Sequence, residues 1–235
     1  MKPVLVLQHL SGDGPAYLAE WLRAQGVPFE VFDTEAGQAY PSHIDAYAAL
    51  AVLGGEMSAN DELPSLRQAE LLIRQAIAQC RPVIGHCLGG QLMARALGAS
   101  VHASPAPEIG WQEMQVLDGA LAREWFGAAA EHTVFQWHSE AFDLPPGAQP
   151  LATSVACPQQ AFAIGPHLGM QFHVELDGDK LGRWSASRDP QYLALQRSCP
   201  TVHSGPAMRE EGERRLARQQ RLADRLYARW LAAAG

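Results

Sequence analysis

A cysteine between two glycines is the residue of this chain best suited to covalent chemistry. Residues 85–91 read GHCLGGQ, follow the apolar run 82–84 and lead into a helix-like segment at 91–97. A strand, a tight turn and a helix in this order form the context that a nucleophile elbow requires. Glycine has no Cβ, so the glycines on either side of Cys87 suit a crowded turn. Because the N-terminus of a helix favours negative charge, the pattern predicts that Cys87 is a nucleophilic thiolate.

A histidine and a carboxylate further along the chain are the partners that a catalytic thiolate needs. Residues 168–175 read LGMQFHVE, a run typical of a buried strand. Side chains i and i+2 of a strand share one face, so we expect the carboxylate of Glu175 to hold the imidazole of His173. Cys87, His173 and Glu175 would then be the nucleophile, the base and the orienting acid.

These segments resemble the motifs of the class I, triad-type glutamine amidotransferases. The elbow at 85–91 is similar to that family's G-x-C-x-G-x-Q, and residues 171–175, QFHVE, contain its H-x-E motif. Residues 52–58, VLGGEMS, resemble its oxyanion strand, which usually reads GGP, with Glu56 in place of the proline. The resemblance extends from Val4 to about residue 184. It is strongest to stand-alone proteins similar to the amidotransferase domain of GMP synthetase.

The resemblance implies a role for each residue of these motifs. Cys87 would attack the side-chain amide of glutamine, and the backbone N–H groups of Gly55 and Leu88 would form the oxyanion hole. His173 would transfer the protons, while Glu175 would hold its tautomer. A further segment, residues 137–139, resembles the family's loop around the amino-acid end of the substrate. The residues implied in substrate binding are Gly54, Gln91, Trp137, His138 and Ser139.

Composition narrows the class of protein. The chain has 235 residues, of which 47% are hydrophobic and 18% charged, as expected of a folded globular protein. Its net charge of -7 argues against a nucleic-acid-binding surface, which needs basic residues. No apolar run approaches the ~20 residues that span a bilayer. Four cysteines without C-x-x-C spacing favour a reduced, cytoplasmic protein.

The hydrophobic pattern predicts an α/β fold in which helices cover both faces of a mostly parallel sheet. Strand-like runs alternate with amphipathic segments in the first part of the chain. The expected strands are 4–7, 29–32, 48–53, 82–84 and 168–174, and the expected helices are 17–25, 62–79 and 91–97. Between them, at 100–170, we expect a short mixed or antiparallel extension with turns at 105–110 and 144–150. The family resemblance implies a flavodoxin-like arrangement.

The sheet also predicts where the site lies. Ligands of open α/β sheets bind beyond the carboxyl ends of the strands, and Gly54, Cys87 and His173 all follow expected strands. We expect one domain over residues 1–235, with a core to about residue 184 and a helical appendage at 185–235. In that appendage, residues 208–231 have the pattern of an amphipathic helix docked on the domain or on a partner.

Several alternatives remain open. No Pro-Cys-x-x-Cys motif supports zinc at Cys87, and no P-loop implies a nucleotide, so no metal or cofactor is expected. His86 and His9 are expected to have structural roles. A separate synthetase subunit could receive the ammonia released from glutamine. Alternatively, the chain could cleave γ-glutamyl peptides with the same triad, or it could use Cys87 as a non-catalytic redox or metabolite sensor.

Overall fold

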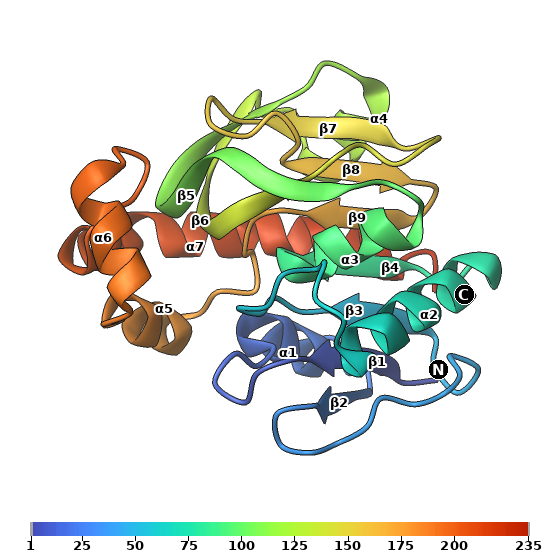
Figure 1. Ribbon diagram of the computed structural model, residues 1–235. Helices are drawn as coiled ribbons and strands as arrows, with labels where there is room; N and C mark the ends of the chain where they lie inside the picture. Colours follow the sequence, from blue (N-terminus) through green and yellow to red (C-terminus); the bar gives the residue numbers. More distant parts are fainter. Residues whose placement is uncertain (1, 235) are drawn as a thin grey trace.

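The computed structural model describes residues 2–234 and contains a sheet of nine strands in the order β2-β1-β3-β4-β9-β8-β7-β5-β6 (Figure 1). The first five of these pair in parallel, and the remaining four extend the sheet in antiparallel fashion. The parallel strands are β1 (Val4–Gln8), β2 (Phe29–Asp33), β3 (Ala49–Val52), β4 (Val83–His86) and β9 (His167–Met170). The predicted α/β fold with a flavodoxin-like parallel core is confirmed.

Helices cover both faces of the parallel half. Helices α2 (Pro64–Ala78) and α3 (Leu88–Ala96) lie in front of the sheet in Figure 1, and α7 (Gly205–Leu231) runs behind it. The central strands β1, β3 and β4 are buried along their whole length, which explains their continuous apolar sequences. The helix predicted at 91–97 in fact begins at Leu88, directly after the candidate nucleophile.

The antiparallel half is more extensive than the sequence indicated. It consists of β5 (Val101–Val116), β6 (Glu131–Phe142), β7 (Gln149–Thr153) and β8 (Ala161–Ile164). The turn predicted at 105–110 is wrong, because these residues lie inside β5. Proline cannot donate a ladder hydrogen bond, and the β5–β6 register shifts between Ala103 and Glu108, where Pro105 and Pro107 lie.

Three helices follow the last strand and lie on different parts of the molecule. Helices α5 (Gly178–Ser185) and α6 (Pro190–Ser198) project from one side, as Figure 1 shows, and pack around a cluster that includes Trp111, Phe135 and Leu181. Helix α7 instead joins the main core and packs beside α1 (Ala16–Ala24) and α4 (Ala120–Phe126). The side chains that it buries there are Leu222, Ala223, Leu226, Tyr227 and Trp230. The predicted amphipathic helix at 208–231 is therefore confirmed and docks on its own chain.

None of the helices within residues 2–234 combines the length and the hydropathy that a membrane span requires.

Candidate active site

Cys87 sits on a sharp turn between β4 and α3. Its backbone has φ 49° and ψ −109°, a conformation that side-chain-bearing residues rarely adopt. Its N–H donates to the carbonyl of Met170 at the end of β9, at 2.9 Å, which ties the turn to the neighbouring strand. A strained residue held in this way at a strand–helix junction is the structural signature of a nucleophile elbow.

The glycines around Cys87 are required by close backbone packing. A Cβ on Gly85 would lie 2.5 Å from the carbonyl carbon of Gly89, and one on Gly89 would lie 2.1 Å from the carbonyl oxygen of Val52. A Cβ on Gly90 would lie 2.3 Å from the carbonyl oxygen of Met170. Helix α3 therefore rests directly on the backbones of β3 and β9, and this contact directs its N-terminus toward Cys87.

His173 and Glu175 form a buried pair next to the elbow. Nδ1 of His173 lies 2.7 Å from Oε1 of Glu175, and both side chains are almost wholly buried. The strand that was predicted to place them on one face is wrong, because β9 ends at Met170. A bend and a turn carry residues 171–175 instead, and the N–H of His173 donates to the carbonyl of Phe135 at 2.9 Å. The pairing that was predicted therefore arises from a turn.

The electrostatics of this pair favour a charged imidazole. Burial acts to lower the pKa of His173, but the carboxylate of Glu175 and the neighbouring Cys87 outweigh it and raise that pKa to about 10. Burial likewise opposes ionisation of Glu175, yet the positive charges of His173 and Lys180 hold its pKa well below the usual range. Because Nδ1 of His173 is occupied by Glu175, Nε2 is the nitrogen left to exchange a proton with Cys87 or a substrate.

The residues predicted to form or flank the oxyanion hole lie next to Cys87 and His173. A Cβ on Gly54 would lie 2.9 Å from Cε1 of His173, and a Cβ on Gly55 would lie 2.9 Å from Cδ2 of Leu88. Leu88 is the first residue of α3, so its N–H is among those that the helix itself leaves unused. The structure thus brings Gly54, Gly55 and Leu88 together around Cys87 and His173.

The residues predicted to bind the substrate differ in their burial and in their contacts. Gln91 is buried, and its Nε2 donates to the carbonyl of Glu140 at 3.1 Å. The predicted loop at 137–139 is wrong, because these residues lie within β6. The carbonyl oxygen of Trp137 faces Cys87, 3.6 Å from its Sγ, whereas Ser139 is exposed.

The side chain of His138 is fully engaged by the protein. Its Nδ1 lies 3.0 Å from the carbonyl oxygen of Glu140, and its Nε2 lies 3.0 Å from Oε2 of Glu108. No ring nitrogen of His138 is therefore free for a substrate.

Glu108, His138 and Cys157 offer donor atoms within 4.8 Å of one another, a set that metals can use. However, Ser154 and Gln160 also bond Glu108, and burial raises the pKa of Cys157 to about 11, which keeps it a thiol. Glu108 and His138 thus belong to a buried hydrogen-bond network with Ser154 and Gln160, while the Sγ of Cys157 donates to the carbonyl of Gln159.

Several residues that line or support the site were not identified from the sequence. Nε2 of Gln171 lies 3.7 Å from the Sγ of Cys87, and the ring of Trp184 meets the ring of His173 edge-on at 4.8 Å between centroids. Lys180 is completely buried, with its Nζ 3.5 Å from Oε1 of Glu175 and 2.5 Å from Oδ1 of Asp13. Asp13 follows β1 at the carboxyl edge of the sheet, a position that could have suggested a role.

The two histidines expected to be structural both lie near the site. His86 is buried, with Nε2 3.3 Å from the hydroxyl of Tyr227 and 4.0 Å from Oε2 of Glu175. The hydroxyl of Tyr40 donates to a backbone carbonyl at 2.9 Å, so Nδ1 of His9, 3.0 Å away, must be the donor to it. Burial lowers the pKa of His9 to about 4 and keeps it neutral, so its Nε2 is an acceptor.

Comparison with known proteins shows the family to which the chain belongs. Residues 16–183 match the model of the family described as glutamine amidotransferase class-I. The chain belongs to this family. A glutamine amidotransferase-like protein of Salmonella typhimurium, YfeJ, is 36% identical over 68% of this chain and 70% of its own length. A glutamine-hydrolysing GMP synthase of Aeropyrum pernix is 28% identical over 77% of this chain but only 35% of its own length.

Solved structures give the same family. The crystal structure of a glutamine amidotransferase from Methylobacillus flagellatus is 36% identical, with a TM-score of 0.91. The similarity covers 99% of this chain and 95% of that one, so it includes the C-terminal helices that lie beyond the family model. This member of the class I glutamine amidotransferase family thus shares its whole architecture, including α5 to α7, with that structure.

Proposed function

We propose that this protein hydrolyses the γ-glutamyl amide bond, with glutamine as its default substrate. One observation carries the proposal: Nδ1 of His173 pairs with Glu175 while the imidazole lies beside Cys87, and these two partners raise the pKa of His173 to about 10 against the effect of burial. A protonated imidazole beside a cysteine favours the thiolate, which is the nucleophilic form. Membership of a family of glutamine amidotransferases supplies the substrate class.

The proposed reaction proceeds in two halves. The Cys87 thiolate attacks the carboxamide carbon, and the N–H groups of Gly55 and Leu88 stabilise the oxyanion. His173 donates its proton to the leaving nitrogen, the C–N bond breaks, and ammonia departs from a γ-glutamyl thioester. Neutral His173 then takes a proton from water as the oxygen attacks the thioester. Collapse of the second tetrahedral intermediate breaks the C–S bond and releases glutamate and the thiolate.

Two further activities share this site, and both have specific support. The aromatic rings of Trp137 and Trp184, both partly exposed, form a wall that reaches His173, a surface suited to a leaving group larger than ammonia. That wall favours γ-glutamyl peptide hydrolysis as the second candidate. The similarity to a third of a GMP synthase supports a separate synthetase partner that accepts ammonia.

Release of glutamate by the wild type, by Cys87→Ser and by Cys80→Ser tests the proposal. The substrates are glutamine and a panel of γ-glutamyl dipeptides. We expect Cys87→Ser to lose activity by about 10³-fold or more, because the nucleophile is removed, and His173→Ala to lose nearly as much. Glu175→Ala loses less, because only the orientation of His173 is degraded. Cys80→Ser changes an exposed cysteine outside the site and retains wild-type activity.

The pattern of substrates decides between the candidates. Release from glutamine assigns a glutaminase, and preference for the dipeptides assigns a peptide hydrolase. Equal activity in Cys87→Ser and wild type would refute the mechanism. If no substrate is cleaved, covalent labelling of Cys87 by an electrophilic glutamine analogue separates an idle amidotransferase, which is labelled, from a thiol sensor without a γ-glutamyl pocket, which is not.

A further inference from the structure

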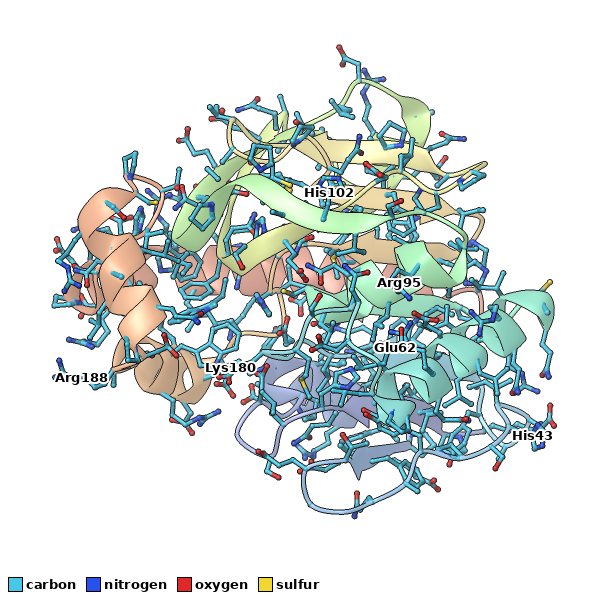
Figure 2. The ribbon with its side chains drawn as sticks, viewed as in Figure 1. His43, Glu62, Arg95, His102, Lys180 and Arg188 are labelled. Atoms are coloured by element: carbon cyan, nitrogen blue, oxygen red, sulfur yellow. The ribbon has the colours of Figure 1, made fainter. Side chains whose placement is uncertain are left out.

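One lysine is buried directly behind the triad. Lys180 belongs to the first turn of α5, and none of its surface is exposed. Figure 2 labels it between α5 and the N-terminal part of the sheet. Its Nζ lies 2.5 Å from Oδ1 of Asp13, 3.5 Å from Oε1 of Glu175, and 5.2 Å from the centroid of the Trp184 ring. Burial of an ammonium group is costly unless it is paired, so these contacts require an explanation.

The lysine joins three separate segments of the chain. Asp13 lies in the loop between β1 and α1, and Glu175 lies in the turn after β9. The side chain of Asp177 accepts from the N–H of Lys180 at 2.7 Å and starts α5 at this point. The carbonyl of Glu175 in turn accepts from the N–H of Tyr17 at 2.9 Å, at the start of α1. The ammonium of Lys180 is therefore placed by backbone contacts on both sides.

We propose that Lys180 is a positioning residue of the catalytic triad, whose ammonium holds Glu175 as a carboxylate and ties it to Asp13. This inference rests on the proposed function, because it assigns Lys180 to the same reaction. Oε1 of Glu175 faces both Nδ1 of His173 and Nζ of Lys180, so the two cations share one carboxylate oxygen. Lys180 thus acts on the imidazole through the acid and contacts no substrate.

The charges around Glu175 show what the lysine contributes. The ionisable groups that face this carboxylate are His173 from its own turn, His86 from β4, Lys180 from α5, and Tyr227 from α7 behind His86. Among these, His173 and Lys180 contribute most to the low pKa of Glu175, against the effect of burial. Without Lys180, Asp13 and Glu175 would be two buried carboxylates around an empty position, and one of them would take up a proton. A protonated Glu175 stabilises an imidazolium poorly.

The variant Lys180→Met tests this role, because methionine fills similar space without charge. Removal of the ammonium raises the pKa of Glu175, so the acidic limb of the kcat/KM profile is expected to move to higher pH. At neutral pH we expect kcat to fall about 10- to 100-fold with a smaller change in KM. In Asp13→Asn/Lys180→Met the carboxylate of Asp13 no longer competes with Glu175 for a proton. We therefore expect the acidic limb to return part of the way to its wild-type position. Lys2→Met is the control. It removes the only other lysine of the sequence, which is exposed, and we expect it to keep the wild-type pH profile of kcat/KM.

A second measurement does not depend on turnover. The rate of alkylation of Cys87 by iodoacetamide is followed against pH by peptide mass spectrometry, in a background with Cys80→Ser and Cys199→Ser. The alkylation profile of Lys180→Met is expected to shift, because a weaker Glu175–His173 pair stabilises the thiolate less. If Lys180→Met does not fold, Asp13→Asn and Asp13→Asn/Lys180→Met are compared instead. We then expect the acidic limb of the kcat/KM profile at higher pH in the double variant than in Asp13→Asn.

The outcomes separate the two proposals. The positioning role is supported if the acidic limb shifts in Lys180→Met and returns part of the way in Asp13→Asn/Lys180→Met. A loss of thermal stability with unmoved activity and alkylation profiles overturns it and leaves Lys180 as a purely structural ion pair. If the wild type cleaves no γ-glutamyl substrate and the glutamine analogue does not label Cys87, but the alkylation profile still shifts in Lys180→Met, the proposed function fails while the positioning role stands.

Discussion

At the scale of single residues, the candidate triad is held by contacts on every side of the imidazole. Nδ1 of His173 meets Glu175, its ring packs edge-on against Trp184, and its backbone N–H bonds the carbonyl of Phe135. These contacts fix the ring orientation before a substrate arrives. Such pre-organisation means that little reorientation is needed in the reaction itself.

The raised pKa of His173 has a consequence for stability. A group whose pKa is higher in the folded state than in the unfolded chain stabilises the fold by binding its proton more tightly. Here the value rises from 6.5 to about 10, so the contribution is complete below about pH 6.5 and is lost as the pH rises through 10. We expect the stability of the wild type relative to His173→Gln to fall steadily between pH 7 and 10.5. Urea denaturation at a series of pH values measures this difference.

A matched variant isolates the part of this stability difference that is due to Cys87. Cys87→Ala removes one of the two partners that raise the pKa of His173, so the pH at which the advantage disappears is expected to be lower. An advantage over His173→Gln that stays constant from pH 7 to 10.5 would contradict the charged imidazole.

Motif letters and spacing were sufficient to identify Cys87, His173 and Glu175 as one group, but they could not identify Lys180. Lysine is almost always a surface residue, so an isolated lysine early in a helix gives no sign of burial. Its partners, Asp13 and Glu175, lie far apart in the sequence, and only the folded sheet brings them together. The orientation of His138 was similarly out of reach, because it depends on Glu108 across the β5–β6 ladder.

At the scale of elements, the site is built by close contact between α3 and the sheet. Helix α3 lies on the backbones of β3 and β9 at Gly89 and Gly90, with no side chain between them. The alternation of strands and helices was readable because buried parallel strands are continuously apolar. The lengths of β5 and β6 could not be predicted from the sequence, because their prolines and glycines indicate turns even where a twisted hairpin accommodates them. The turn at 171–175 was also missed, since its apolar sequence is indistinguishable from that of a strand.

Gly89→Ala tests the contact between α3 and β3. The new Cβ would lie 2.1 Å from the carbonyl oxygen of Val52, so the helix must move away from the strand. We expect a loss of stability of roughly 1–3 kcal/mol or more, as for other overpacked sites, together with a loss of activity. Gly182→Ala is the matched control, because this glycine lies inside α5 and a Cβ there meets no atom within 4 Å. It should gain up to about 1 kcal/mol from helix propensity. Equal thermal shifts in the two variants would refute the close contact.

At the scale of the whole molecule, α7 connects the two halves of the sheet to the candidate site. It runs behind the sheet in Figure 1 and contacts α1, α4 and α5 as well as β5 and β6. Its Tyr227 reaches His86, and its Gln219 reaches the backbone of His173. The amphipathic pattern of α7 was readable from the sequence, but its docking place was not. The helix lies beyond the residues that match the family model, yet it supports the residues at the centre of the site.

Gln219 is the point at which this long-range support can be tested. Its Oε1 accepts from the N–H of Phe135 at 2.6 Å, and its Nε2 donates to the carbonyl of His173 at 3.1 Å. Gln219→Leu leaves both backbone groups buried without these partners, at a cost of about 1–3 kcal/mol for each. Because the backbone of His173 loses a support, we expect a fall in kcat as well as a lower melting temperature.

The same substitution one residue further along α7 is the control. Gln220→Leu changes a partly exposed glutamine, so it leaves the backbone of His173 in place and should alter neither kcat nor the melting temperature by a comparable amount. Thermal denaturation and steady-state kinetics on both variants separate the effects. If Gln219→Leu lowers the melting temperature but keeps the wild-type kcat, α7 supports the fold without supporting the triad. A loss of kcat in Gln219→Leu alone would mean that the C-terminal helix positions His173 from behind the sheet.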